Sequence, residues 1–440
     1  MSTLKLNLYR IKIKKLNQPK IIYILLDGIG DLPHQDLNHL TPLEAAYTPN
    51  LDRIARMGVS GQVVSVGDGI APQSDIAVFN MLGYNFKDIE YFGRGVVECI
   101  GCGIDFKDGD LALRGNFATI DPTNQKILDR RAGRIVTKAD SVAICDLIRK
   151  NVKIEGIEFS IEPTIGHRVV LRFRMKDRPL GENVTNTDPA YDKINGIGIA
   201  LDTSKGDLYV ARSMSKDDNS QLSADIINQF SDQVTKILDN CPVNLGRKEK
   251  NLLAINCIIL RDAGNRYPHL QSINEKYNLN FASLVDMPVE IGISQILGMK
   301  SYNAGLPDEY ELKATELLKI IDNHDVLYVH IKGPDEFGHD GNAKGKKRNI
   351  DEIDKRFFGK IYEGINTKGL EINFIISGDH STPCIKKAHT DDPIPIIISG
   401  RGMNKDATSR FTESNSKRGS LGKIYGYQVL STALKQLEKR

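Results

Sequence analysis

The sequence predicts an α/β protein whose main sheet is mostly parallel and flanked by helices. Short apolar runs rich in β-branched residues end in glycine-containing turns, which is typical of buried parallel strands. Helical periodicity separates successive runs, and strands that alternate with helices indicate a parallel sheet. With 440 residues the chain exceeds the usual size of one hydrophobic core, so we expect two domains.

The first predicted strand is the apolar run Lys20–Leu26, which ends in the turn Asp27-Gly-Ile-Gly-Asp31. A buried strand explains this run better than a helix, because it is short and glycines end it. A second short strand is predicted near Val63–Val66. After the loop 67–73, a helix is predicted to begin at Ser74.

The same pattern returns three times in the last third of the chain, in the runs Val326–Ile331, Ile372–Ile376 and Ile394–Ile398. A helix with one buried face is predicted between the first two runs, from apolar residues at Ile350, Ile353, Phe357 and Ile361. The basic cluster 344–348 is interpreted as the solvated start of that helix. Ligands of parallel sheets bind at the carboxyl ends of strands, so we expect the polar loops to lie together.

The middle of the chain alternates strand-like and helix-like runs and carries many arginines. We therefore expect a discontinuous core domain, 20–104 with 287–440. A smaller α/β domain is expected to be inserted at 105–286. Residues 1–19 are basic without a continuous apolar stretch, so they are interpreted as an N-terminal extension rather than a secretory signal.

Composition and charge exclude several classes of function. No apolar run approaches the roughly 20 residues that span a bilayer. A net charge of +3 and a pI near 8.3 are too mild to indicate nucleic-acid binding. The six cysteines frame no small disulfide domain, and the pair Cys99 and Cys102 has no second pair to complete a zinc site. We expect a cytoplasmic protein with a small-molecule substrate and no nucleic-acid or membrane partner. The sequence does not indicate an oligomeric state.

Acidic and histidine residues gather in the loops after the predicted strands: Asp27, Asp335, His339, Asp379, His380 and His389. Each alone could be a capping carboxylate or a core histidine, but their shared location favours metal ligands. Mixed Asp and His ligands suit borderline divalent metals such as zinc and manganese better than calcium. Six ligands and one serine are enough for two metals that clamp the attacking and leaving oxygens of a displacement.

Ser74 is the candidate nucleophile. It opens a predicted helix, where backbone N–H groups and the helix dipole favour an anion. A serine at this place is commonly a helix N-cap, and the metal cluster is what favours catalysis. Coordination to a metal is one way to activate a serine hydroxyl at neutral pH.

An Asp-Gly near the start, a helix-opening Ser, Asp-x-x-x-His, Asp-His and a final His follow one another in the order of the alkaline-phosphatase superfamily. More specifically, the chain resembles the archaeal-type 2,3-bisphosphoglycerate-independent phosphoglycerate mutases. Beside the residues above, the resemblance is carried by Thr41-Pro-Leu-Glu-Ala-Ala46, Thr48-Pro-Asn-Leu-Asp52, Leu82-Gly-Tyr84, Gly93-Arg-Gly95, Arg114-Gly-Asn-Phe-Ala-Thr119, Asp129-Arg-Arg-Ala-Gly-Arg134, Gly333-Pro-Asp-Glu-Phe-Gly-His339 and Gly378-Asp-His-Ser-Thr-Pro383. Gln73 and Asp262 stand where the family commonly has glycine.

The resemblance implies a set of site residues. One metal would be held by Asp335, His339 and His389, and the other by Asp27, Ser74, Asp379 and His380. Manganese is the first expectation, with magnesium, cobalt or zinc as alternatives. The inserted domain would supply the substrate clamp from Arg114, Arg130, Arg131 and Arg134, with Asp129 as an acid/base; His167, Arg168 and Lys313 are further candidates. Arginine forks suit carboxylate and phosphate because each donates two parallel hydrogen bonds.

The implied activity is the interconversion of 3-phosphoglycerate and 2-phosphoglycerate in glycolysis and gluconeogenesis, through a phosphoserine and without 2,3-bisphosphoglycerate. A metal-dependent phosphatase, or a homoserine-kinase-like phosphotransferase, would share the core ligands. A non-catalytic metal-binding protein is the third alternative, and it predicts loss of some of the seven site residues. All seven are present, and the arginine-rich insert favours the mutase.

Overall fold

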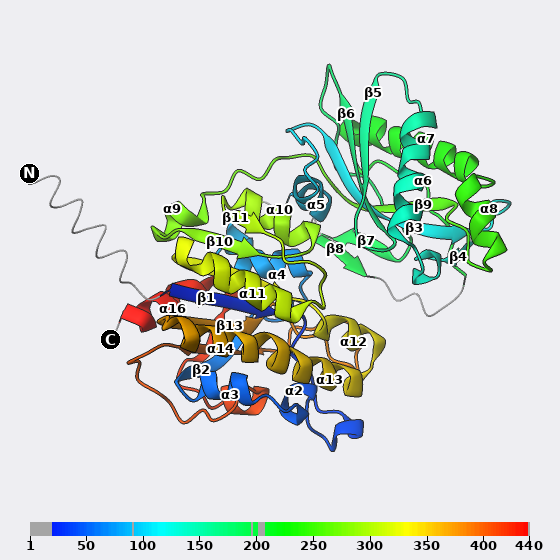
Figure 1. Cartoon of the computed structure of the whole chain (residues 1–440). Coiled ribbons are helices and arrows are strands. Elements are labelled where there is room, and N and C mark those ends of the chain that lie inside the picture. Colours follow the sequence, from blue (N-terminus) through cyan, green and yellow to red (C-terminus); the bar gives the residue numbers. More distant parts are fainter. Residues whose placement is uncertain (1–19, 90–91, 195–196, 201–206, 439–440) are drawn as a thin grey trace, which may run out of the picture. The chain divides into compact units, whose positions relative to one another are not determined.

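The computed structural model describes residues 20–89, 92–194, 197–200 and 207–438. The N-terminal extension expected at 1–19 lies outside the described residues. Two compact units divide the chain (Figure 1). Of the described residues, the core unit comprises 20–89, 271–286 and 297–438, and the insert unit comprises 92–194, 197–200, 207–270 and 287–296.

These boundaries differ from the sequence-based ones at both junctions. Residues 92–104 belong to the insert unit because helix α5 (Arg94–Gly101) packs on the sheet of that unit. Helix α10 (Pro288–Ile296) packs against α5 and belongs with it. Residues 271–286 belong to the core unit because β10 (Phe281–Leu284) is a strand of the core sheet.

The core unit is built on one eight-stranded sheet, in the order β11-β10-β12-β1-β13-β14-β2-β15. The strands are β1 (Lys20–Leu26), β2 (Gly58–Val64), β10, β11 (Lys300–Tyr302), β12 (Val326–Ile331), β13 (Ile372–Gly378), β14 (Ile394–Ser399) and β15 (Gly422–Tyr425). All neighbours pair in parallel except at β14, which runs antiparallel to β13 and β2. The expected α/β fold with a mostly parallel, helix-flanked sheet is confirmed.

The strand register brings four loops to one edge of this sheet. Leu26 of β1 pairs with Ile331 of β12 and with Gly378 of β13, so these three strands end side by side. Strand β14 runs the other way, so its first residue, Ile394, lies at this edge as well. Residues that follow β1, β12 and β13 therefore meet residues that precede β14.

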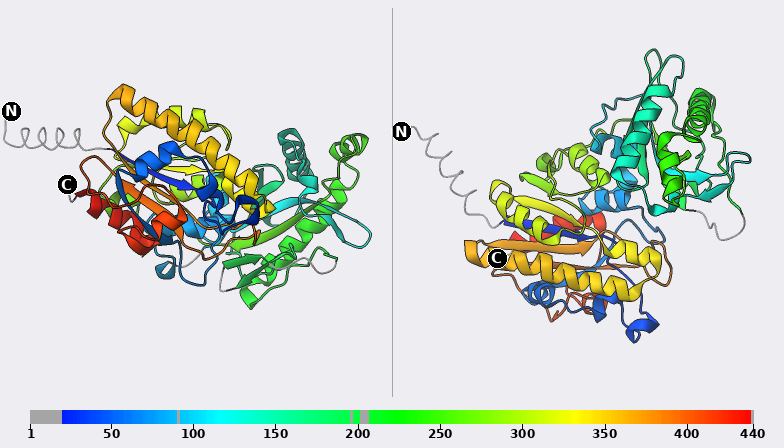
Figure 2. Two further views of the ribbon diagram at one scale, coloured as in Figure 1. Left: turned by 90° about the horizontal axis from the view of Figure 1, so that it is seen from below. Right: turned by 45° about the vertical axis from the view of Figure 1, so that its right-hand side comes forward.

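Helices cover both faces of the core sheet (Figures 1 and 2). They are α2 (Pro42–Ala45), α3 (Pro49–Ala55), α4 (Ser74–Met81), α9 (Ile273–Tyr277), α11 (Tyr310–Ile320), α12 (Pro334–Asp340), α13 (Ala343–Ile353), α14 (Gly359–Lys368), α15 (Glu413–Ser416) and α16 (Val429–Glu438). Ile22 and Ile24 pack with Leu317 of α11 in one buried cluster. The alternate residue Tyr23 points to the other face, where its hydroxyl donates to the carbonyl of Met81 at the end of α4.

The insert unit has an antiparallel sheet, in the order β4-β3-β6-β5. Strand β9 also pairs with β3, outside this order. Its remaining elements are β3 (Leu111–Ile120), β4 (Ile127–Asp129), β5 (Ile157–Pro163), β6 (Arg168–Met175), β7 (Tyr191–Ile194), β8 (Ile197–Ala200), β9 (Cys257–Gly264), α6 (Lys138–Asn151), α7 (Gln221–Leu238) and α8 (Pro242–Glu249). Phe230 of α7 meets Phe159 and Phe173 of the sheet edge-on, at ring-centroid distances of 5.6 and 5.4 Å. These contacts join the helix to the sheet in a second hydrophobic core.

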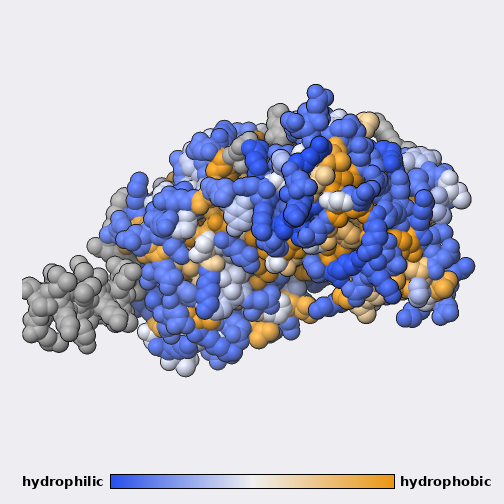
Figure 3. Space-filling model, turned by 90° about the horizontal axis from the view of Figure 1, so that it is seen from above, coloured by the Kyte–Doolittle hydropathy of each residue, from blue (hydrophilic) through white to orange (hydrophobic). Residues whose placement is uncertain are grey.

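The face of the molecule drawn in Figure 3 is mainly hydrophilic, with hydrophobic residues scattered among polar ones. Scattered exposed apolar residues are normal on a globular surface. Within the ranges that the structure describes, no helix combines the length and the apolar character needed to cross a membrane.

Candidate functional site

The edge where the four loops meet is held together by close backbone contacts. Asp27 follows β1 and Asp379 follows β13, and the Gly28 N–H donates to Asp379 Oδ1 at 3.0 Å. Gly28 has a φ of +60°, and a Cβ there would lie 2.7 Å from Asp335 Cβ. Glycine is therefore required on both grounds: the left-handed backbone and the approach of the loop to Asp335.

The first predicted ligand group, Asp335, His339 and His389, comes together. Asp335 and His339 are one turn apart on α12, and His339 Nε2 lies 3.5 Å from Asp335 Oδ2. His389, in the loop before β14, places Nε2 3.4 Å from Asp335 Oδ1 and 3.2 Å from His339 Nε2. The three ligand atoms lie within 4.8 Å of one another, as a metal site requires.

The second predicted group, Asp27, Ser74, Asp379 and His380, is centred on one ring nitrogen. His380 Nε2 lies 3.5 Å from Asp27 Oδ1 and 3.4 Å from Asp379 Oδ2. Ser74, the first residue of α4, places Oγ 3.3 Å from the same nitrogen. Asp27, Asp335 and His380 also form a group of potential ligands, so the two predicted sets adjoin.

The electrostatics of these groups suit a cation. Among the described residues, neither Asp27 Oδ1 nor Asp379 Oδ2 receives a hydrogen bond, although both atoms are buried. Burial and the nearby Asp27 carboxylate raise the pKa of Asp379 well above its usual value. Burial, together with His389, lowers the pKa of His380 to about 3, which leaves a neutral imidazole. A buried carboxylate beside a neutral imidazole, as at Asp379 and His380, supplies the donors that a divalent metal needs.

Other groups orient the candidate ligands. Thr382 Oγ1 donates to Asp335 Oδ1 at 2.6 Å and lies 3.1 Å from His380 Nδ1. His389 Nδ1 lies 2.7 Å from the carbonyl oxygen of Pro72, and His339 Nδ1 lies 3.2 Å from that of Lys387. Partners on Nδ1 leave the Nε2 atoms directed at the cluster, as in metal sites.

Lys346, one of the basic residues of the cluster 344–348, is buried and not solvated as expected. Its Nζ donates to Asp31 Oδ2 at 2.8 Å and to the carbonyl oxygens of Gly30 and Thr382 at 3.0 Å each. The interpretation of the whole cluster as solvated was wrong, because one lysine turns inward to neutralise Asp31. This ammonium ties together the loops that carry Asp27 and His380.

Sequence reasoning missed two residues of this site, His330 and Lys332. Lys332 follows β12 as Asp27 follows β1, and its Nζ lies 3.0 Å from Asp27 Oδ2. His330 is buried inside β12 and faces both Asp27 and Asp379. The place of Lys332 after a strand was a usable signal. For His330 the apolar run around it predicted only burial.

Two of the predicted clamp residues of the insert unit, Arg114 and Arg130, lie in an arginine cluster with Arg261 around Asp188 and Tyr191. Arg130 binds Asp188 in two places, Nε to Oδ1 at 3.1 Å and Nη2 to Oδ2 at 2.8 Å. Arg261 Nη1 donates to the same carboxylate at 2.9 Å and stacks over the Tyr191 ring at 4.5 Å. Arg114 pairs with Glu98 at 3.1 Å.

His167 shows that further cations converge in the insert unit. Burial and the charges of Arg168, Arg131, Arg261 and Arg134 lower its pKa to about 3. The loop before α6 is also strained, because Ala132 and Arg134, on either side of Gly133, have left-handed φ angles of +45° and +58°. Asp129 Oδ1 accepts a 2.7 Å hydrogen bond from the Arg131 N–H at the start of this loop. Strained backbone conformations of this kind are common at functional sites, where they fix the direction of side chains.

Asp262, which replaces the glycine expected at its position, has a φ of +59° within β9. A left-handed φ explains why glycine is common there. The Asp262 carboxylate lies 3.3 Å from Arg114 Nε and 3.7 Å from Arg261 Nε, so it adds negative charge to the arginine cluster.

Lys313 does not belong to this cluster, because it lies on α11 of the core unit. It is buried and forms an ion pair with Asp286. Its charge makes the smallest contribution to the lowered pKa of His330, after burial, Lys332 and His380.

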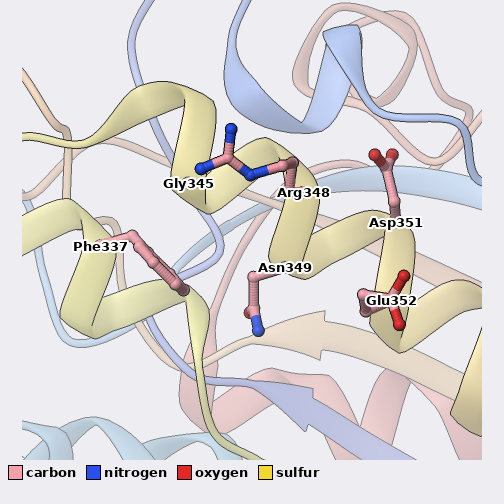
Figure 4. Close-up of a pocket in the computed structure, with 6 residues that line it drawn as sticks. All are labelled: Phe337, Gly345, Arg348, Asn349, Asp351 and Glu352. Atoms are coloured by element: carbon pink, nitrogen blue, oxygen red, sulfur yellow. The ribbon is translucent and has the colours of Figure 1, made fainter.

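A pocket of about 410 Å³ lies beside α12 and α13. Its lining residues are Phe337, Gly345, Arg348, Asn349, Asp351 and Glu352 (Figure 4). None of the candidate ligands lines it, so the chemistry is assigned to the strand-end cluster.

The chain is similar to proteins of known family over nearly its whole length. Residues 55–244 match the family model for 2,3-bisphosphoglycerate-independent phosphoglycerate mutase. The protein of that name from Aeropyrum pernix is 38% identical over 427 residues, which cover 95% of this chain and 99% of that relative. Its namesake from Pyrococcus horikoshii is 33% identical and covers 93% of this chain and 95% of its own.

Solved structures agree with these relatives. The cofactor-independent phosphoglycerate mutase of Thermoplasma acidophilum superimposes with a TM-score of 0.61 at 28% identity, over 95% of this chain and 99% of that one. A protein of Pyrococcus horikoshii gives a TM-score of 0.75 at 26% identity, over 96% and 98%. With relatives of this identity and coverage, the chain belongs to the 2,3-bisphosphoglycerate-independent phosphoglycerate mutase family.

Proposed function

We propose that this protein interconverts 3-phosphoglycerate and 2-phosphoglycerate, in glycolysis and gluconeogenesis, through a phosphoserine on Ser74. The observation that carries the proposal is the position of Ser74 Oγ, 3.3 Å from His380 Nε2 in the cluster of carboxylates and imidazoles. The names of relatives that match nearly the whole chain support the same reaction. The six cysteines are free thiols, which supports a reducing cytoplasm.

The proposed site binds two divalent cations, with manganese as the leading candidate, because its donors include both nitrogen and oxygen atoms. Asp335, His339 and His389 would hold one cation. Asp27, Ser74, Asp379 and His380 would hold the other. When bound, the cations would lower the pKa of the serine hydroxyl and neutralise charge on the transferring phosphoryl group.

The residues of the chain carry the remaining steps. Ser74 attacks the phosphorus of 3-phosphoglycerate as an alkoxide, and the bond from phosphorus to the 3-oxygen breaks as Asp129 gives its proton to that oxygen. The arginine cluster, with Arg114, Arg130, Arg131, Arg134, His167 and Arg168, holds the glycerate carboxylate. Asp129 then takes the proton of the 2-hydroxyl as this oxygen attacks the phosphoserine and releases Ser74.

The arginine cluster favours a mutase over a phosphatase or a homoserine-kinase-like phosphotransferase. A phosphoserine is open to attack by any nearby oxygen, including water at about 55 M, so a mutase must hold glycerate and exclude water. Water alone needs no array of guanidinium groups. The arginines whose charges lower the pKa of His167 form the kind of cationic site that an anionic intermediate requires.

A coupled assay tests the proposal. Conversion of 3- to 2-phosphoglycerate is measured without 2,3-bisphosphoglycerate, on enzyme treated with a chelator and on the same enzyme restored with Mn²⁺. We expect activity to disappear with the chelator and return with Mn²⁺, and labelled free glycerate to stay out of the product pool. Release of inorganic phosphate as the main product, or rapid entry of free glycerate, would replace the mutase by a phosphatase or phosphotransferase.

A further inference from the structure

His330 is a buried histidine in a central strand, and it is not among the ligands considered so far. It lies in β12, next to β1 in the sheet, and its residue is 1% exposed. Its Nε2 atom points at two carboxylates, 3.6 Å from Asp379 Oδ2 and 3.9 Å from Asp27 Oδ1. The three ligand atoms lie within 4.8 Å of one another, and all three residues are buried.

The distances favour metal coordination over hydrogen bonding. A separation of 3.6 Å or more between donor and acceptor is too long for a hydrogen bond. Two ligand atoms bound to one metal at about 2.1 Å are roughly 2.9 to 3.4 Å apart, depending on the geometry. The separations at His330 exceed this range by only a few tenths of an ångström. Its oxygen neighbours, Asp27 Oδ1 and Asp379 Oδ2, are the buried atoms that receive no hydrogen bond among the described residues.

The other ring nitrogen of His330 is already engaged. The Tyr328 hydroxyl lies 2.9 Å from His330 Nδ1, two residues earlier on the same face of β12. A partner at Nδ1 that accepts its proton leaves the lone pair of Nε2 directed at the carboxylates. Metal-bound histidines have this arrangement, in which an outer partner fixes the ring and its tautomer.

We propose that His330 is a metal ligand through Nε2, and that it joins Asp27 and Asp379 at the second metal position. This inference rests on the proposed two-metal function. It adds a fifth protein donor to Asp27, Ser74, Asp379 and His380. A second imidazole at this position favours Mn²⁺, Co²⁺ or Zn²⁺ over Mg²⁺, which prefers oxygen ligands.

Metal titration of His330→Gln tests the proposal, because glutamine keeps a hydrogen-bond donor but supplies no imidazole. Affinities for Co²⁺ and Mg²⁺ are measured by calorimetry, and the absorption spectrum of the Co²⁺ protein reports the coordination. We expect one of two Co²⁺ ions to bind at least about tenfold more weakly with an altered spectrum, while Mg²⁺ affinity changes little. The matched control is His324→Gln, since His324 is also a buried histidine paired with a tyrosine hydroxyl, 3.1 Å from Tyr302.

A second measurement uses the unmodified protein, so it does not depend on the folding of a variant. Anomalous diffraction from Mn²⁺-loaded crystals locates both ions, and we expect His330 Nε2 about 2.2 Å from one of them. A distance above about 3 Å, or unchanged Co²⁺ affinity and spectrum in His330→Gln, overturns the ligand assignment.

The two proposals fail in different ways. If Asp379→Ala loses a metal and His330→Gln does not, the ligand assignment is wrong and the two-metal function stands. If the unmodified protein binds two ions, one of them at His330, but does not convert phosphoglycerates, the proposed reaction is wrong and the His330 assignment stands.

Discussion

The imidazole rings of His380 and His389 stack with their centroids 3.8 Å apart and their planes 24° from parallel. Each ring belongs to a different ligand group, so the stack is where the two groups touch. Burial disfavours a charged His389, but its hydrogen bond to Asp335 outweighs this and raises its pKa. For His380, burial and the neighbouring His389 lower the pKa to about 3. Two ions held by these groups would be close enough to share one phosphoryl group.

Replacing His389 tests the first ligand group. His389→Ala removes a donor 3.4 Å from Asp335 Oδ1, so we expect one metal per chain to be lost and mutase activity to fall at least about 100-fold. Elemental analysis and the coupled assay measure the two effects. His39→Ala, at an exposed histidine of the same unit, serves as the control. Full metal content in His389→Ala would remove His389 from the ligand set.

Ser74→Ala separates the nucleophile from the metals. The carboxylates and imidazoles remain, so metal content should change little while phosphoryl transfer disappears. Mass spectrometry of unmodified enzyme quenched during turnover should find one phosphate on Ser74. An active Ser74→Ala enzyme, with phosphate on another residue, would contradict the assignment.

Arg131→Ala weakens the proposed hold on glycerate. Arg131 is one of the cations that lower the pKa of His167, so its loss reduces the positive charge of the cluster. We expect mutase activity to fall about tenfold or more, and the fraction of turnovers that release inorganic phosphate to rise. Arg212→Ala, at an exposed pair with Asp232, is the control. Equal loss of both products would indicate a general defect instead of a leak to water.

Asp262 allows charge and backbone strain to be separated. Asp262→Asn removes only the charge beside Arg114, so we expect lower stability and tighter binding of anions such as phosphate. Asp262→Gly removes the charge and relieves the φ of +59°, so it should be about 1 kcal/mol more stable than the asparagine variant. Denaturant unfolding and phosphate titration measure both. Two variants of equal stability would show that the left-handed backbone costs nothing here.

Glu413 gives a pH dependence of stability. Burial raises its pKa to about 7, although the Thr41 hydroxyl donates to it at 2.8 Å. The ordinary value in an unfolded chain is about 4.3, so the folded state binds more protons between pH 4.3 and 7. The contribution of Glu413 to the free energy of unfolding is fully present below about pH 4.3 and is lost as the pH rises towards 7. Glu413→Gln should therefore be more stable than the unmodified protein at pH 8. We expect a difference of about 2 kcal/mol, which is less than the whole pKa shift would give, because the side chain is partly exposed to solvent. The difference should vanish near pH 4.5, and a constant difference across this range would contradict the shift.

The candidate ligands could be predicted because turn chemistry marks where buried strands end. Asp27, Asp335 and Asp379 each follow an apolar run, and the pairing of Leu26 with Ile331 and Gly378 brings them together as expected. The antiparallel direction of β14 could not be predicted, since an apolar run indicates a buried strand but not whether it pairs parallel or antiparallel with its neighbours.

Residues inside elements were harder to predict than those at strand ends. His330 lies within an apolar run, where periodicity predicts burial but not which groups a side chain meets. Lys346 lies in a charged helix start, and only the buried carboxylate of Asp31, 315 positions earlier in the chain, explains why it turns inward. Long-range pairing of this kind leaves no local pattern.

The central position of β1 has a consequence for how the chain acquires its structure during synthesis. The two neighbours of β1 in the sheet, β12 and β13, are translated about 300 and 350 residues later. This apolar, buried strand therefore leaves the ribosome long before a partner exists, while most of the insert unit is continuous in sequence and can fold first. Such distant pairing makes folding slow and exposes an aggregation-prone strand. A nascent chain halted before residue 326 should thus depend on chaperones to stay in solution, and its ligand residues cannot assemble early.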